Sequence, residues 1–268
     1  MDALCDSTNQ ALGDPALGYA RAIDGTPKHN GSTNYFLYNS ATVAQLTAAQ
    51  LGVRPSDCWM SDDSTDVPGS GATASTTKCG GFFSLESSTS VPTERTAAWA
   101  VFRQKATGAT VLVVSPHTSA ELGTGWDARR TTQVQNLVAK TQRIAATLHV
   151  TNVVYGGDFN NYVGRPGLAD STTPVMRTAG YPDAIDAAQH ASNTKFLSGN
   201  QYLRSPLATP DGKPGYACLD HVFVTPGIAV RSFNEALRLT SAGQFADAAI
   251  PSDHNPVWSD LYLRPPAS

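Results

Sequence analysis

Two apolar segments in close succession constrain the fold of this chain more than any other feature. AAWAVFR (97–103) and ATVLVVS (109–115) have the composition of buried strands, and QKATG between them predicts a β-hairpin. Within residues 129–149 the apolar side chains recur at helical spacing, which predicts one long amphipathic helix. NVVYGG (152–157) then predicts a short buried strand that delivers Asp158 at its C-terminal end.

The rest of the sequence predicts smaller elements. We expect a polar, irregular start with a short helix near residues 3–12, and a surface loop rich in Gly, Ser and Thr over 57–80. Further elements are expected as a strand and turn within 34–46, a helix over 174–180, and strands over 217–224, 227–236 and 256–263. No repeat or clear boundary divides the sequence, so we expect residues 1–268 to form a single domain.

The composition excludes several classes of protein. With 268 residues, 41% of them hydrophobic, the chain can bury a sizeable core. Its 19 basic and 22 acidic residues give a net charge of −3, and no basic run stands out, so bulk electrostatic binding to duplex nucleic acid is not expected. No apolar run is long enough for a membrane-spanning helix. We expect a monomer.

The cysteines suggest an oxidising compartment. Cys58 and Cys79 flank a loop of small polar residues, which favours a disulfide between them over free thiols; a Cys5–Cys218 bridge is a weaker alternative. None of the four lies in a CxxC pair, so a structural zinc site is not expected. Disulfides imply export, although the first 30 residues lack the basic and apolar regions of a signal peptide.

The segment GGDFN (156–160) places an acid and an amide at the end of a predicted strand. In extended backbone, Asp158 and Asn160 would point one way and Phe159 the other. Asp158 could then accept a proton from an attacking water, and Asn160 could donate to a phosphate oxygen. A local turn, in which both side chains bond to nearby backbone groups, is the alternative explanation.

A second motif, SDHNPV (252–257), precedes the last predicted strand. A catalytic histidine needs a carboxylate to set its tautomer and to stabilise its protonated form, and Asp220, at the start of another predicted strand, is the candidate partner of His254. Asp253 would then be available to bind a hard metal ion. A capping aspartate beside a surface histidine would give the same pattern without catalysis.

Two residues near the predicted hairpin are weaker candidates. His117 follows the strand 109–115 and could donate to a phosphate oxygen, while Arg95 precedes the strand 97–103 and could bind an anionic substrate. A loop histidine without a role is about equally common, and most arginines in such positions are merely solvated. His221 is expected to be structural because alternation turns it away from Asp220. The remaining candidates are expected at the surface or in packing: His29, His149, His190, Trp99 and Trp126.

The order of these motifs resembles the endonuclease/exonuclease/phosphatase superfamily, the deoxyribonuclease I-like fold, from about residue 34 to 263. The resemblance implies an α+β fold, a four-layer α/β/β/α sandwich of two mostly antiparallel sheets with the active site at one end. It also implies roles for the candidate residues. Asp158 would activate water and Asn160 position phosphate, His254 with Asp220 would stabilise the pentacovalent phosphate, Asp253 would bind Mg²⁺ or Mn²⁺, and His117 and Arg95 would contact the substrate.

Two departures from the family pattern stand out. The histidine motif is PHT where many members have Thr-His-Leu. The early strand that ends in Gln-Glu, whose glutamate is a main metal ligand, has no counterpart, since the first glutamate of the chain is Glu86. We therefore expect an N-terminally truncated member of a secreted branch, with weakened metal binding and reduced activity.

The expected function is divalent-metal-dependent hydrolysis of phosphate esters by in-line attack of an activated water, with a phosphodiesterase or nuclease favoured. A phosphatase or sphingomyelinase-type phosphodiesterase, or an impaired fragment that only binds, are the alternatives. The substrate would be nucleic acid or a small-molecule or lipid phosphodiester. A serine hydrolase is disfavoured because the sequence contains no G-x-S-x-G motif.

Overall fold

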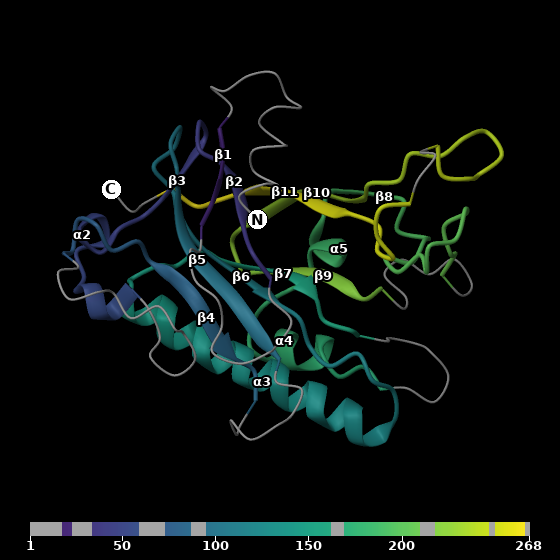
Figure 1. Cartoon of the computed structure of the whole chain (residues 1–268), viewed down its shortest axis with the longest axis horizontal. Coiled ribbons are helices and arrows are strands. Elements are labelled where there is room, and N and C mark those ends of the chain that lie inside the picture. The colour runs from purple at the N-terminus through teal and green to yellow at the C-terminus, as the bar shows by residue number, and fades with distance from the viewer. Residues whose placement is uncertain are drawn as a thin grey trace. The chain divides into compact units, whose positions relative to one another are not determined.

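The computed structural model describes seven stretches of the chain (Figure 1): 18–22, 34–58, 73–86, 95–161, 169–209, 218–246 and 250–265. The chain divides into two compact units. The first comprises Met1–His117, Asn136–Val154 and Leu263–Ser268, and the second comprises Thr118–Gln135 and Tyr155–Tyr262. The prediction of a single domain stays a prediction.

The sheet of the first unit is built around β5 (Thr96–Gln104), whose first seven residues are buried. Its antiparallel partners are β3 (Val43–Gln45), β4 (Gly80–Ser84) and β6 (Thr110–Pro116). The β5–β6 pair is the predicted hairpin, and its register aligns Val101 with Leu112. The strand β4 was not predicted. A smaller antiparallel pair, β1 (Tyr19–Arg21) and β2 (Leu37–Asn39), also belongs to this unit.

Aromatic and small side chains share the core of the first unit. Phe82 of β4 and Phe102 of β5 are buried with alanines of β5, and Tyr35 and Tyr38 contact these two rings edge-on or tilted. Alternating large and small residues let neighbouring strands pack closely. The core therefore depends on β4, whose side chains fill the space that the β5 alanines leave.

Helix α3 (Thr124–Thr147) begins before the predicted residue 129 and belongs to both units. In the first unit, Asn136 donates to Leu85 O at 2.9 Å and Lys140 donates to Ser84 O at 2.9 Å, so the helix is tied to the end of β4. In the second unit, Arg130 is fully buried and paired with Asp127. None of the helices in the described stretches is long and apolar enough to cross a membrane.

Two short helices lie near Cys58 and its partner in the first unit. Helix α2 (Ala48–Leu51) has a capping box formed by Thr47 and Gln50, and η2 (Pro55–Cys58) follows it. Cys58 pairs with Cys79, and both are buried. The alternative Cys5–Cys218 bridge and the predicted helix 3–12 involve residues outside the described stretches.

The second unit contains the strands that carry the candidate site residues of the sequence. β7 (Val153–Asp158) starts in the first unit and ends in the second, where β9 (Asp220–Val224) is its neighbour in the sheet. A separate sheet pairs β10 (Ala229–Glu235) with β11 (Val257–Tyr262) antiparallel and with β8 (His190–Ser192) parallel. The predictions for β7, β9, β10 and β11 are confirmed, whereas β8 was not predicted.

The helices of the second unit are short. α4 (Thr173–Thr178) was predicted, and α5 (Ala184–Ala187), which Asp183 caps through the Ile185 amide, was not. The two main sheets and few helices give an α+β fold with mostly antiparallel sheets, as the sequence predicted.

Candidate active site

The end of β7 forms a tight turn that joins Asp158 to Asn160. Asp158 Oδ1 accepts from the Asn160 amide at 2.8 Å, and Asn160 Nδ2 donates to Asp158 Oδ2 at 3.1 Å and to Thr118 O at 3.0 Å. The prediction of extended backbone is wrong here, because Asn160 has φ 44°. Asparagine tolerates this left-handed conformation, and its short side chain bonds back to the turn.

The turn changes what Asn160 can do. The side-chain nitrogen already donates to Thr118 O and Asp158, so its observed contacts hold the carboxylate in place. Phe159 is fully buried against Phe223 and anchors the turn in the core. Asp158 is thereby oriented by two hydrogen bonds and keeps a side chain that is 18% exposed.

His254 lies between two carboxylates. Its Nδ1 is 2.7 Å from Asp220 Oδ2, and its Nε2 is 4.0 Å from Asp158 Oδ2. The hydrogen bond with Asp220 is the main cause that raises the pKa of His254 to about 9; Asp158 and Asp253 add smaller effects in the same direction. At neutral pH the ring is therefore protonated, and it can donate to an anionic oxygen.

A loop of residues 197–201 is hydrogen-bonded to the segment that carries Asp220. The Ser198 hydroxyl accepts from the Leu219 amide at 2.9 Å and from the Asp220 amide at 3.1 Å. The carbonyl of Ser198 accepts from the Asn255 amide at 2.5 Å. One fully buried serine thus fixes the backbone on both sides of the Asp220–His254 pair.

Asn200 makes the second half of this connection. Its Nδ2 donates to Ser252 O and to Asn255 Oδ1, each at 3.0 Å, and its amide donates to Asp253 O at 2.6 Å. The Asn255 Nδ2 donates to Leu197 O at 2.8 Å. The loop that carries His254 is therefore held by buried hydrogen bonds on both sides of the histidine.

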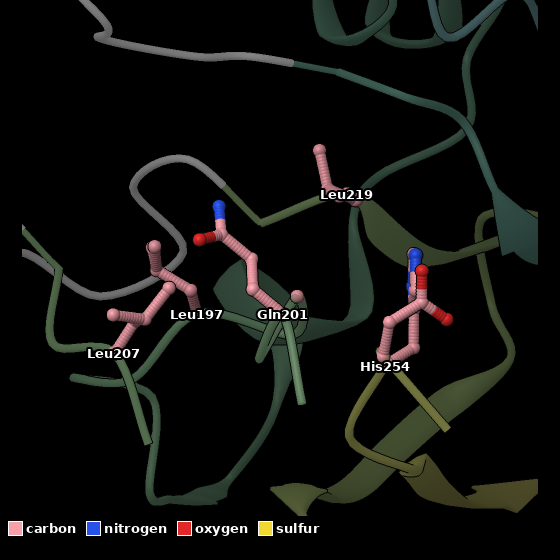
Figure 2. A pocket seen from close by; sticks show the side chains of 7 residues that line it. Leu197, Gln201, Leu207, Leu219 and His254 are labelled. Carbon is pink, nitrogen blue, oxygen red and sulfur yellow. The ribbon is translucent and has the colours of Figure 1, made fainter. Parts of the chain in front are cut away.

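A pocket adjoins His254 in the second unit (Figure 2). Its lining comprises Leu197, Gly199, Gln201, Leu207, Leu219, Asp253 and His254. Three leucine side chains form the apolar part of the wall, and the carboxamide of Gln201 and the carboxylate of Asp253 add polar groups. Small-molecule sites commonly combine apolar walls with a few polar groups in this way.

Asp253 is the candidate metal ligand. Its side chain is exposed, and in the stretches that the structure describes it accepts no hydrogen bond. No group of three or more His, Cys, Asp or Glu side chains suited to a metal occurs among those described residues. Mg²⁺ is commonly held by one or two carboxylates, with waters and substrate phosphate completing the shell. Asp253 fits that mode of binding and does not form a preassembled cage.

Arg95 and His117 lie together in the first unit. Arg95 Nη1 is 3.2 Å from His117 Nε2, and both side chains are partly exposed. Since arginine only donates, the histidine nitrogen is the acceptor, and the ring proton is carried by Nδ1. The two predicted substrate residues therefore form one hydrogen-bonded pair, which carries the positive charge of Arg95.

A second Asp–His pair, Asp183 and His221, is buried in the core. His221 is buried, with Nδ1 2.6 Å from Asp183 Oδ2 and Nε2 3.1 Å from Cys218 O. Burial lowers the pKa of His221, but the Asp183 carboxylate outweighs this effect and raises it. Successive residues of β9 thus face opposite ways: Asp220 toward His254 and His221 toward the core, where the sequence predicted a structural role. His149 and His190 are exposed, and Trp99 is fully buried, also as expected.

A buried acid was missed by the sequence reasoning. Glu235 is fully buried at the end of β10, its Oε1 is 3.5 Å from Cys218 Sγ, and its Oε2 has no partner within the described stretches. Burial raises the pKa of Glu235 to about 8, and also raises the pKa of the Cys218 thiol. The only sequence signal was an acid on the apolar face of an alternating strand.

Comparisons with known proteins agree with this fold. No protein-family model and no curated protein sequence matches the chain. Its structure is similar to a mannosyl-6-phosphatase from Bacteroides thetaiotaomicron, with a TM-score of 0.63 and 16% identity over 97% of this chain and 82% of that one. An endonuclease/exonuclease/phosphatase family protein from the same organism gives a TM-score of 0.62 with 16% identity, covering 97% and 79% of the two chains.

A third similar structure is the endonuclease/exonuclease/phosphatase from Bacteroides vulgatus, with a TM-score of 0.55 and 18% identity over 97% of this chain and 82% of that chain. At these identities the likeness concerns the fold, and it extends over nearly the whole chain. The chain therefore has the fold of the endonuclease/exonuclease/phosphatase superfamily, which the order of its motifs had indicated.

Proposed function

We propose that this protein hydrolyses phosphate esters by in-line attack of a water molecule. The observation that carries the proposal is the position of His254, hydrogen-bonded to one carboxylate and 4.0 Å from another. A protonated imidazole beside an oriented carboxylate supplies a donor for a developing phosphate charge and an acceptor for a proton of water.

Each residue has a distinct part in this proposal. Asp158, oriented by Asn160, accepts the proton of the attacking water. His254, kept protonated by Asp220, donates to a non-bridging phosphate oxygen. A divalent cation, Mg²⁺ or Mn²⁺, when bound at Asp253, would neutralise phosphate charge. Arg95 would contribute positive charge to the substrate, and His117 would donate to a phosphate oxygen.

Phosphodiesters, including nucleic acid, are the first candidate substrates, as the sequence motifs indicate. The net charge of −3 argues against tight binding of duplex DNA, so a small-molecule or single-stranded diester is favoured. Phosphomonoester hydrolysis is a second candidate, supported by the similarity of fold to a mannosyl-6-phosphatase. The pairing of Cys58 with Cys79 supports a secreted protein as part of the same proposal.

The test compares four substrates in Mg²⁺ or Mn²⁺ and in EDTA: bis-(p-nitrophenyl) phosphate, p-nitrophenyl phosphate, single-stranded DNA and plasmid DNA. Metal-dependent turnover that falls by about 10²–10⁴ in Asp158→Ala is the expected result. Asp260→Ala, an exposed acid on β11 outside the site, serves as the matched control. A folded chain without turnover on any substrate would favour the alternative, a chain that only binds.

A further inference from the structure

The turn that follows Asn200 holds two residues in a strained backbone conformation. Gln201 and Tyr202 both have positive φ, 54° and 57°, in succession. Non-glycine residues adopt this conformation at a cost and persist there when surrounding contacts impose it. Asn200 imposes it here, since its Oδ1 accepts from the Tyr202 amide at 2.8 Å and its carbonyl accepts from the Leu203 amide at 3.0 Å.

The same turn makes direct backbone contacts with the loop that carries Asp253 and His254. Gly199 forms an isolated antiparallel β-bridge with His254, and the Gln201 amide donates to Asp253 O at 3.3 Å. Gly199 lies close to Leu219, because a Cβ at this glycine would be 3.2 Å from a Leu219 methyl group. The position of Gln201 is thus coupled to His254 through the backbone.

The strained turn brings the Gln201 side chain into the pocket beside His254. Figure 2 shows it extending between the leucines of one wall, Leu197 and Leu207, and Leu219. The neighbouring Tyr202 is 62% exposed and does not line the pocket. A carboxamide both donates and accepts, so it suits a ligand that carries hydroxyl groups.

The residues that line the pocket indicate which class of ligand it can bind. Among the described residues that line it, the imidazole of His254 is the only ring, whereas proteins that bind nucleobases usually stack them on aromatic side chains. Leucine methyl groups can instead cover the C–H face of a sugar or polyol while its hydroxyls reach the carboxamide. The pocket therefore fits a small polyhydroxylated alcohol better than a base.

We propose that Gln201 determines substrate specificity by binding the alcohol part of the phosphate ester, which is a sugar or polyol. This inference rests on the proposed function, because it places the phosphate at His254 and the alcohol in the adjoining pocket. The strain in the turn then has a functional explanation: it holds the carboxamide at the position that the alcohol occupies.

The test compares Gln201→Gly with Tyr202→Gly. Glycine adopts positive φ freely, so both variants relieve the same kind of strain, but only the first removes a pocket side chain. We expect neither variant to lower the Tm. With glucose 6-phosphate, Gln201→Gly should raise KM about tenfold and leave kcat within about twofold, as expected for lost hydrogen bonds to a bound substrate. With p-nitrophenyl phosphate, which lacks hydroxyls, KM should change less than about twofold.

Binding of glucose 6-phosphate in EDTA, measured by ligand-observed NMR, separates this inference from the proposed function. Wild-type binding that Gln201→Gly weakens would support the inference even without turnover. Turnover with equal effects of Gln201→Gly on both substrates, or equal effects of the two glycine variants, would overturn it and leave the proposed function standing. If Gln201→Gly does not unfold cooperatively, Gln201→Asn carries the test, because asparagine tolerates the backbone and withdraws the carboxamide by one methylene. Its KM for glucose 6-phosphate should rise, and an unchanged KM would overturn the inference.

Discussion

Asp220→Asn should separate the charge of the site from its geometry. The amide oxygen of the new side chain can still accept from His254 Nδ1, which now lies 2.7 Å from Asp220 Oδ2. The orientation of the ring is therefore retained, while the carboxylate that stabilises its protonated form is lost. We expect the pKa of His254 to fall from about 9 toward its ordinary value of 6.5, remaining somewhat above it because Asp158 and Asp253 also raise it.

The size of the effect follows from this shift. A change from about 9 to 6.5 corresponds to roughly 3 kcal/mol of preferential binding of the proton. The His254 side chain is 28% exposed, so solvent screening makes this an upper figure. The alkaline limb of the pH–kcat profile, which lies near pH 9 in the wild type, should therefore move to lower pH by about one to two units in the variant.

The same shift predicts how stability depends on pH. A histidine whose folded-state pKa is raised contributes stability that is fully present below pH 6.5 and is lost as the pH rises through about 9. Asp220→Asn should therefore be most destabilised relative to the wild type below pH 6.5, and the difference should vanish above pH 9. Urea unfolding at a series of pH values measures this.

Proton–nitrogen NMR of the imidazole ring in wild type and variant gives the pKa of His254 directly. Equal values in the two proteins would refute the reasoning, because they would show that Asp220 does not govern the protonation of His254. An alkaline limb that moves while the pKa of His254 stays fixed would show instead that another group controls the rate.

Three further predictions concern stability. In Glu235→Gln, stability relative to the wild type should improve by up to about 5 kcal/mol between pH 4.5 and pH 8, because a buried acid whose folded-state pKa is raised to about 8 loses stability as the pH rises through this range. A pH-independent difference in urea unfolding would contradict this prediction. Asp127→Ala should lower the free energy of unfolding in urea by about 3–5 kcal/mol, because it leaves the charge of the fully buried Arg130 without its carboxylate. A decrease below about 1 kcal/mol would show that the pair is hydrated. Reduction of the Cys58–Cys79 bond should cost about 3 kcal/mol, as expected from a separation of 21 residues, and thermal unfolding with and without dithiothreitol tests it against the double alanine variant, in which reduction should have no effect.

The elements that the sequence predicted well carry their own local signal. β5 and β6 are continuous apolar runs, and α3 keeps an apolar stripe over many turns, so their patterns survive without knowledge of their neighbours. β4 has no such signal, because its sequence opens with two glycines after a polar loop. Gly80 is required by a close strand contact, since a Cβ there would lie 2.9 Å from Trp99 O.

Within the site, the motifs predicted which residues meet and did not predict how they are held. The proximity of Asp220 and His254 followed from family-type motifs, whereas the positive φ of Asn160 depends on the bond to Thr118 O, which is distant in sequence. Ser198 and Asn200 lie in a polar loop with no periodic pattern. The partners of their side chains in the Leu219–Asp220 and Ser252–Asn255 segments are 21 to 55 residues away, so only the folded chain identifies them.

The loop of residues 197–201 has one property that affects how experiments on this protein can be interpreted. Its contacts to the catalytic segments come from a hydroxyl, two carboxamides and backbone groups, none of which gains or loses a proton in water at ordinary pH. The loop therefore does not change its charge with pH, and it should keep its conformation while His254 and the carboxylates beside it are titrated. Titration of this loop therefore does not contribute to changes in rate with pH.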